Sequence, residues 1–332
     1  MTEIIYDKPF KTYAEQVSLL RDKHGLTIKN SKFAETALRT FTYYDLVNGY
    51  KDSFMKNDKY LDGLTFEFIY LFAITDKDFQ SIMFKYSTIV ENSFKSKLAY
   101  VIAKHFGVHQ NDYLAPNKYF NGNNKILFSD VNAACQYILN GQKLAPQPTK
   151  YYLEHHNHVP PWILLKNLSF SNSINLFQLL RRPEKEELVD SLIRSPKLSF
   201  DEKVNFLISA LNIIRSFRNK IAHNLRFSAY KSYSHMLPPN IAIKLFPKSL
   251  LTWRDINKDK RGTNDIYAYL LSLFCLLEDP FLRLYCAREI EHVLTRGEQG
   301  KDHLKQSSDF YFEQTNLPKD IANRFKYFKM PK

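Results

Sequence analysis

The chain has 332 residues, enough for one large domain or two ordinary ones and ample to bury a core. Hydrophobic residues make up 44% and charged residues 24%, so it is expected to fold, and its nine glycines argue against Gly-rich phosphate loops and turn-dense all-β folds. Lys and Arg number 47 against 34 Asp and Glu, and the formal net charge of +13 favours a polyanionic partner.

The sequence shows no feature of membrane insertion or of an oxidising compartment. It starts without the basic and apolar segments of a signal peptide, and its longest apolar stretch, residues 266–277, is too short to cross a bilayer and is expected to be a buried helix. The three cysteines are far apart and odd in number, which supports neither a disulfide framework nor a cysteine zinc site. We expect a cytoplasmic protein with no membrane contact, no metal and no cofactor.

Helical periodicity runs through nearly the whole chain and predicts an all-α fold. Near the start, Thr12 and Glu15 have the spacing of a capping box, and Gly25 supplies a stop. A second helix is predicted over about 31–46. Two short helices joined by a turn also suit a helix-turn-helix, so one alternative function is a DNA-binding regulator that uses these N-terminal helices.

The later elements follow the same periodicity. A helix opens at Pro160-Pro161 and carries Trp162, because proline is tolerated in a first turn. Residues 111–125 and 141–150 are predicted to be loops. The chain is expected to divide into an N-terminal segment (1–60), a central domain (61–235) and a C-terminal extension (236–332), with Pro238-Pro239 near the second boundary. The other predicted helices span about 64–74, 76–106, 130–140, 185–194, 200–224, 264–278, 281–296 and 318–328.

Positive charge is concentrated in one part of the sequence. From Lys203 to Arg254 there are nine Lys or Arg and no Asp or Glu, and a milder enrichment in Lys runs from Lys85 to Lys125. Aromatic residues interleaved with these charges could stack unpaired bases. The pattern predicts an RNA- or DNA-binding surface, although most aromatics must fill the core. The residues expected to bind RNA are Arg215, Lys220, Arg226, Lys231, Lys95 and Lys97.

The segment 204–223 carries the most specific signal. Its apolar residues form one broad helical arc, and Arg218 falls inside that arc, where a charge is expensive unless it is paired or reaches the rim. Arg215, Asn219 and His223 form one row at the adjoining edge, with a spacing of four residues, and Asn224 is placed to cap the helix end.

These residue types are the ones needed to cleave RNA without a metal. An Arg can stabilise the charge that develops on a phosphate, a His can move protons near neutral pH, and an Asn can position the phosphate or the His. One His per chain is few for acid and base catalysis, so a two-fold homodimer that places two such helices face to face is expected.

The hexapeptide from Arg218 to His223, RNKIAH, resembles the R-x4-H motif of HEPN-domain ribonucleases. Stretches at 8–26, 40–54 and 155–172, with the tail at 317–321, are similar to the abortive-infection branch (AbiD/AbiF-like) of that superfamily. The resemblance implies a HEPN-like helical bundle with added terminal helices, a dimer with a composite site, and metal-independent cleavage that leaves 2′,3′-cyclic phosphate and 5′-OH ends. It also implies a toxin-like role against phage, a structured noncoding RNA as a partner in some relatives, and a polar residue facing the motif, for which Glu91 is the candidate.

Two other interpretations compete with this one. The same basic helix could grip RNA without cutting it. A zinc site is the other interpretation, because three histidines lie beside Glu154: His155, His156 and His158. Their spacing before two prolines does not aim them at one zinc ion, so a loop near the cleft that touches RNA is favoured.

Overall fold

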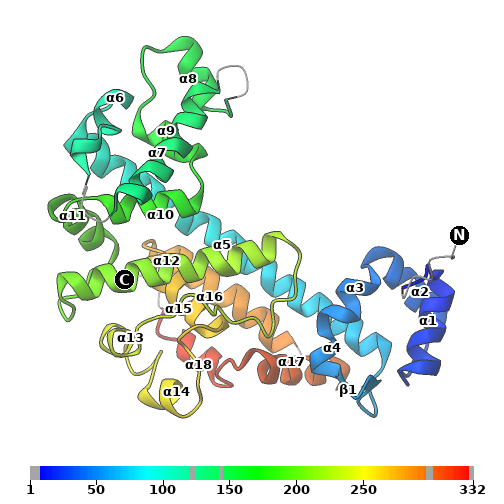
Figure 1. Cartoon of the computed structure of the whole chain (residues 1–332). Coiled ribbons are helices and arrows are strands. Elements are labelled where there is room, and N and C mark those ends of the chain that lie inside the picture. The colour runs from blue at the N-terminus through cyan, green and yellow to red at the C-terminus, as the bar shows by residue number, and fades with distance from the viewer. Residues whose placement is uncertain (1–7, 120–123, 142–144, 297–301, 329–332) are drawn as a thin grey trace, which may run out of the picture. The chain divides into compact units, whose positions relative to one another are not determined.

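The computed structural model describes residues 8–119, 124–141, 145–296 and 302–328, and its fold is all-α, as the periodicity predicts (Figure 1). The chain divides into two compact units, each made of three stretches. Unit 1 contains residues 1–82, 220–230 and 289–319; unit 2 contains residues 83–219, 231–288 and 320–332. The division of the chain at about residues 60 and 235 stays a prediction.

Unit 1 begins with the helix predicted from the capping box. α1 (Tyr13–Ser18) starts after Thr12, whose backbone N–H donates to the Glu15 carboxylate at 2.7 Å while Glu15 N–H donates back to the Thr12 hydroxyl at 3.3 Å. A π-helical turn, Leu19–Lys23, continues it. Gly25 then adopts a φ of +70°, a left-handed conformation that suits glycine, and the predicted stop is confirmed.

The single helix predicted over 31–46 is two helices in the structure. α2 (Ser31–Thr40) ends at Phe41, which is extended, and α3 (Tyr43–Leu46) starts anew because the Thr42 hydroxyl caps it by accepting from Asp45 N–H at 3.3 Å. A 3-10 turn, Asn48–Tyr50, and α4 (Lys51–Phe54) follow. The Thr-x-x-Asp spacing at 42–45 is itself a capping signal, and it overrides the apolar periodicity.

A short hairpin that the periodicity did not reveal follows α4. β1 (Met55–Lys56) pairs with β2 (Lys59–Tyr60) in an antiparallel register that joins Met55 to Tyr60. The two turn residues, Asn57 and Asp58, have φ values of 50° and 60°. Asn and Asp tolerate this left-handed region better than other residues with a side chain, and a two-residue turn of this type matches the twist of paired strands.

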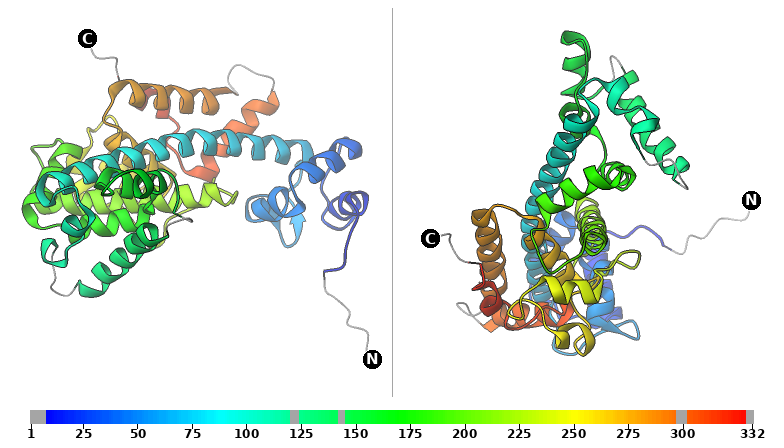
Figure 2. Two further views of the ribbon diagram at one scale, coloured as in Figure 1. Left: turned by 90° about the horizontal axis from the view of Figure 1, so that it is seen from above. Right: turned by 90° about the vertical axis from the view of Figure 1, so that its left-hand side faces the viewer.

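α5 (Phe66–Phe106) is one helix, so the predicted interruption near Thr75 is wrong (Figure 2). Thr75 satisfies its hydroxyl by donating to Leu71 O at 3.0 Å, and the Asp76 side chain is fully buried among hydrogen-bond donors. Two polar residues that would otherwise break a helix are therefore accommodated inside it.

The core of unit 1 is aromatic. Phe54, Phe72 and Phe310 are neighbours, with ring centroids 5.0 Å apart for Phe54 and Phe310 and 5.3 Å apart for Phe54 and Phe72. Phe310 lies on α17 (Asp302–Thr315), a helix that the sequence did not predict because its residues are mostly polar. Tertiary packing of its few aromatic residues, rather than local pattern, defines this helix.

In unit 2 the second half of α5 is packed against shorter helices. The Phe94 ring lies 6.3 Å from that of Phe170 and 6.1 Å from that of Phe177 on α10, a helix that was not predicted. The predicted loop at 111–125 contains a helical turn and a 3-10 turn, and residues 120–123 and 142–144 of the predicted loops lie outside the described ranges. The elements are α6 (Gln110–Tyr113), a 3-10 turn (Pro116–Lys118), α7 (Lys125–Asn140), α8 (Thr149–His155), α9 (Pro161–Asn167), α10 (Phe170–Leu179) and α11 (Arg182–Leu192).

The later helices complete the fold. α15 is buried along almost its whole length, which confirms the apolar stretch at 266–277 as a core helix. Among the described helices there is none whose length and hydrophobicity would let it cross a membrane. These elements are α12 (Phe200–Ala222), α13 (Pro239–Leu245), α14 (Trp253–Asn257), α15 (Ile266–Leu276), α16 (Pro280–Thr295) and α18 (Ile321–Phe325).

Candidate functional site

The helix α12 buries its apolar arc and presents Arg218 at the edge of that arc. Phe217 is fully buried and stacks on Tyr269 of α15, with ring centroids 4.7 Å apart. This contact fixes the rotation of the helix, and Arg218 follows directly, with 30% of its side chain exposed. The buried residues of the arc are Phe206, Leu207, Ala210, Leu211, Ile213, Ile214 and Phe217.

The charge on Arg218 is paired with Glu91 of α5. Arg218 Nη2 donates to Glu91 Oε2 at 2.9 Å, and Lys95 Nζ lies 2.7 Å from Glu91 Oε1. The Glu91 side chain is only 12% exposed. Two cations on a largely buried carboxylate make the arrangement tolerable, because a buried charge without a partner is costly. Glu91, the residue suggested to face the motif, therefore meets Arg218.

This ion cluster lies at a small cleft in unit 2. The cleft has a volume of about 240 Å³ and is lined by α5, α9 and Arg218. Lys166, on α9, adds a third cation and donates to Asn92 Oδ1 at 3.3 Å. Trp162, also on α9, lines the cleft with 47% of the residue exposed. The lining therefore combines positive charge with an accessible aromatic face.

Asn219 and His223 are at the surface. Asn219 is exposed, and its Oδ1 accepts from Arg218 Nη1 at 3.2 Å. α12 ends at Ala222, and the exposed His223 is the first residue beyond it. His223 is thus five residues after Arg218 in the chain, and its imidazole is accessible to a ligand.

The helix end is closed as predicted. Asn224 has a φ of 57°, its N–H donates to Ile221 O at 2.9 Å, and Leu225 N–H donates to Lys220 O at 3.1 Å. These two bonds make a Schellman motif, which satisfies the last carbonyls of a helix. Lys77 Nζ donates to Asn224 Oδ1 at 2.6 Å and fixes this cap within unit 1.

The segment after the cap is anchored by the buried Asp76. Asp76 Oδ2 accepts from Phe227 N–H at 3.2 Å and from the Tyr50 hydroxyl at 3.0 Å, and Oδ1 accepts from the Tyr311 hydroxyl at 2.9 Å. Burial raises the pKa of the Asp76 carboxyl despite these hydrogen bonds, which oppose the rise. This network holds the chain at Phe227, four residues beyond His223.

The six residues predicted to bind RNA differ in their surroundings. Lys231 is exposed, whereas Lys220 packs over the Tyr230 ring at 5.0 Å and Arg215 Nη1 donates to Ser171 Oγ at 3.0 Å. Lys95 and Lys97 each have a carboxylate partner, Glu91 and Glu278 respectively.

Arg226 is held inside unit 1 and donates to Gly49 O at 3.3 Å and to the Ser53 hydroxyl. Desolvation lowers the pKa of its guanidinium. Arg226 therefore has internal partners that RNA would need to replace.

The three histidines before the proline pair contact aromatic and polar neighbours. His155 stacks on Tyr151 with ring centroids 4.3 Å apart, His156 packs on Tyr152 at 4.5 Å, and His158 Nδ1 lies 2.7 Å from Asn157 Oδ1. Within the described ranges, no three His, Cys, Asp or Glu side chains gather in a way that could hold a metal ion.

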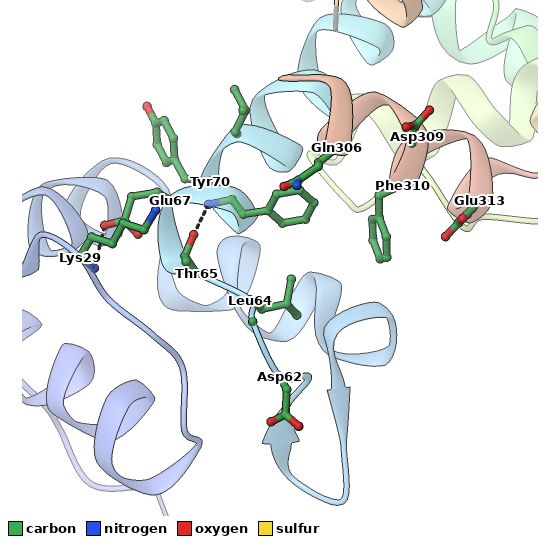
Figure 3. A pocket seen from close by; sticks show the side chains of 13 residues that line it. Lys29, Asp62, Leu64, Thr65, Glu67, Tyr70, Gln306, Asp309, Phe310 and Glu313 are labelled. Atoms are coloured by element: carbon green, nitrogen blue, oxygen red, sulfur yellow. Dashed lines mark hydrogen bonds between the residues drawn. The ribbon is translucent and has the colours of Figure 1, made fainter. Parts of the chain in front are cut away.

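A larger cleft in unit 1, of about 830 Å³, has the opposite charge (Figure 3). Its carboxylates are Asp62, Glu67 of α5, and Asp309 and Glu313 of α17, and Lys29 also lines it. Glu67 Oε1 accepts from the backbone N–H groups of residues 29 and 30 at 3.1 and 3.0 Å. The acidic lining repels phosphate, so this cleft is unsuited to an RNA backbone.

Three residues at or near the site were not predicted from the sequence. Lys166 and Trp162 line the cleft of Arg218 because α9 lies beside α5, and only tertiary packing sets that neighbourhood. Asp76 gave no signal because three of its hydrogen-bond partners lie 26, 151 and 235 residues away in the chain, and only Gln80 is near in sequence.

The Glu91 cluster carries a stability prediction. We expect Glu91→Ala to lower the free energy of unfolding by about 3 kcal/mol, because Arg218 and Lys95 would then face each other without a carboxylate. Glu91→Gln keeps an acceptor for Arg218 and should lose less. Urea denaturation measures both.

The matched control for this prediction is Glu187→Ala. Glu187 pairs with the exposed Lys104 at 2.9 Å, and such surface pairs contribute less than about 1 kcal/mol. Equal losses for Glu91→Ala and Glu187→Ala would contradict a special role for the cluster.

Comparisons with known proteins give one family. Residues 36–228 match the model of the Abi-like protein family, a match that covers more than half of the chain and includes Glu91, the α9 residues and the RNKIAH motif. Neither the curated proteins nor the solved structures contain a match. The chain belongs to the Abi-like protein family.

Proposed function

We propose that this Abi-like protein is a metal-independent endoribonuclease that acts as a toxin-like effector against phage. Membership of the family supports a function of the abortive-infection type. The finer proposal is supported by one observation above all. Arg218 lines a cationic cleft with its guanidinium held by Glu91, and the exposed His223 follows five residues later in the same RNKIAH motif.

The chemistry uses the nucleophile that RNA itself carries. The 2′-oxygen attacks the adjacent phosphorus, a bond forms between them, and the bond from phosphorus to the 5′-oxygen breaks. One imidazole takes the proton of the 2′-OH and another donates a proton to the leaving 5′-oxygen. Arg218 stabilises the extra negative charge on the phosphorane, and Asn219 positions the phosphate. The products are a 2′,3′-cyclic phosphate and a 5′-OH.

A homodimer supplies the second imidazole. Each chain brings one His223, and a two-fold axis that places two motifs face to face gives one acid and one base. The exposure of His223 and Asn219 suits such a face. Glu91 acts as a positioning residue in this proposal, because it orients the Arg218 guanidinium from α5. Bound noncoding RNA would occupy the same positive surface.

The test is cleavage of RNA in the presence of EDTA. We expect the purified protein to cut RNA at an unchanged rate in the chelator and to leave 2′,3′-cyclic phosphate ends, detected by mass spectrometry of the fragments. The control is an Arg218→Ala/His223→Ala double variant purified in the same way, which reports any contaminating nuclease. Cleavage that stops in EDTA contradicts the proposal.

A second function is separated by the same experiment. If the protein retains RNA and neither preparation cuts it, the basic helix α12 only grips phosphate. RNA that copurifies, seen by absorbance and identified by sequencing, should first be removed, because a bound noncoding RNA would block the site.

A further inference from the structure

The cations that line the cleft at Arg218 differ in how many hydrogen-bond partners they already have within the protein. Lys95 Nζ pairs with Glu91 Oε1 at 2.7 Å and donates to Leu168 O at 2.6 Å, and the Lys95 side chain is 12% exposed. Lys166, by contrast, is exposed and makes one long bond of 3.3 Å to Asn92. Arg218 lines the cleft and keeps 30% of its side chain exposed beside Glu91. Lys166 and Arg218 are therefore the groups with capacity to bind a phosphate.

The aromatic side of the same cleft is formed by Trp162, whose position is set by α9. α9 starts at Pro161 and buries Leu164 and Leu165, which fixes the helix against unit 2. Trp162 lines the cleft together with Leu165 of the same helix face and keeps 47% of its surface exposed. An indole held in this way offers a flat face on which an unpaired base can stack.

The volume limits what can enter. Drug-sized ligands fill cavities of roughly 300–1,000 Å³. A cleft of about 240 Å³ is smaller, so it has room for no more than one nucleotide. Asn92 and Ser96 are exposed on the α5 side of the lining and can donate or accept hydrogen bonds at the edge of a base.

We propose that Trp162, Lys166 and Arg218 form a subsite for one unpaired nucleotide of RNA, with the base stacked on the indole and the phosphate held by the two cations. The subsite rests on the proposed function for its ligand, since Arg218 belongs to both. It defines the substrate class as single-stranded RNA, because the bases of an A-form duplex are stacked on one another and cannot reach a side chain.

The two tryptophans of the chain make a direct test possible. Trp253→Phe leaves Trp162 as the only indole, and Trp162→Phe leaves Trp253, which is also exposed, at 60%, on α14. The probe is a short single-stranded oligonucleotide with 2′-O-methyl groups, which block the attacking hydroxyl. We expect it to quench the fluorescence of the Trp253→Phe protein in a saturable manner and to leave the Trp162→Phe protein's emission unchanged.

Affinity measurements complete the test. Trp162→Ala should weaken binding of the oligonucleotide by about 5- to 100-fold, whereas Trp162→Phe should retain most of it because a stacking ring remains. Lys166→Ala should weaken binding by about 10-fold or less, the effect of one phosphate contact. A blunt duplex of the same sequence should not quench Trp162.

The possible failures are distinguishable. If the oligonucleotide binds, as seen by anisotropy, but Trp162 emission does not change, the subsite is wrong. It is also wrong if Trp162→Ala cuts single-stranded RNA with an unchanged KM, and in that case the proposed nuclease stands. If the wild-type protein neither binds nor cuts any RNA, the proposed function fails and the subsite fails with it.

Discussion

Replacing His223 by Ala is expected to lower the rate of RNA cleavage by about 10²- to 10⁴-fold, the range that proton transfer by a positioned side chain contributes. His223 is exposed beyond the last residue of α12, so its removal leaves no cavity and should not change the free energy of unfolding. RNA affinity should also be retained, because the cations of the cleft are untouched. Cleavage of a labelled single-stranded RNA in EDTA measures the rate.

His292→Ala is the matched control for this variant. His292 is exposed on α16 and lies outside the motif, so its removal should leave the rate within about two-fold of the wild-type value. A His223→Ala protein that cuts RNA as fast as His292→Ala would remove the catalytic role from His223. It would leave the basic helix as a phosphate-binding element.

Arg218 is expected to act together with His223 in the same catalytic step. Arg218→Ala is expected to reduce cleavage by about 10²- to 10³-fold, the effect of removing one donor that stabilises developing charge. Arg218→Lys keeps the charge but loses the planar fork that binds two oxygens, so it should restore only part of the rate. The effects of substituting residues that act together are not additive. The Arg218→Ala/His223→Ala protein should therefore cleave RNA only slightly more slowly than the slower of the two single variants.

The sequence allowed the helical edge of this site to be predicted, but not its surroundings. Arg218 beside an apolar arc, the neighbouring Asn219 and the cap at Asn224 follow from the 3.6-residue period of one helix, whereas His223, which was expected in its last turn, is the first residue beyond it. The ion pair between Glu91 and Arg218 joins residues 127 positions apart, and only the family resemblance suggested it. Lys166 and Trp162 depend on where α9 packs, which no local pattern encodes.

The same distinction between local pattern and tertiary packing explains which helices were predicted wrongly. Periodicity located α12 and α15 within about two residues because each buries a long apolar face. It joined α2 to α3, since the capping threonine at position 42 breaks the helix without breaking the apolar pattern. It divided α5 near Thr75 because a polar pair in the middle of a helix resembles an end. Asp76 is instead a buried partner for distant segments of unit 1, and this has a consequence for stability.

Asp76→Ala is expected to lower the free energy of unfolding by about 4 kcal/mol. The change would leave Phe227 N–H, the Tyr50 and Tyr311 hydroxyls and the Gln80 amide without their shared acceptor, and each buried donor without a partner costs about 1–3 kcal/mol. Tyrosine hydroxyls can rotate toward other acceptors, which keeps the total below the sum. Because Phe227 follows the motif closely, cleavage should fall as well.

Asp76→Asn separates the charge from the hydrogen bonds. Burial raises the pKa of Asp76, so the folded protein binds this proton more tightly than the unfolded chain, and the ionised carboxylate carries a free-energy penalty above the raised pKa. That penalty disappears as the pH falls through the raised pKa toward the ordinary value near 3.8. Asparagine has no such penalty. The free energy of unfolding of wild type minus that of Asp76→Asn should therefore increase as the pH is lowered through this window, and other carboxyls cancel in the difference. Urea denaturation of both proteins across this range gives the slope, and a difference that decreases toward low pH would mean that the hydrogen bonds outweigh burial and lower the pKa of Asp76.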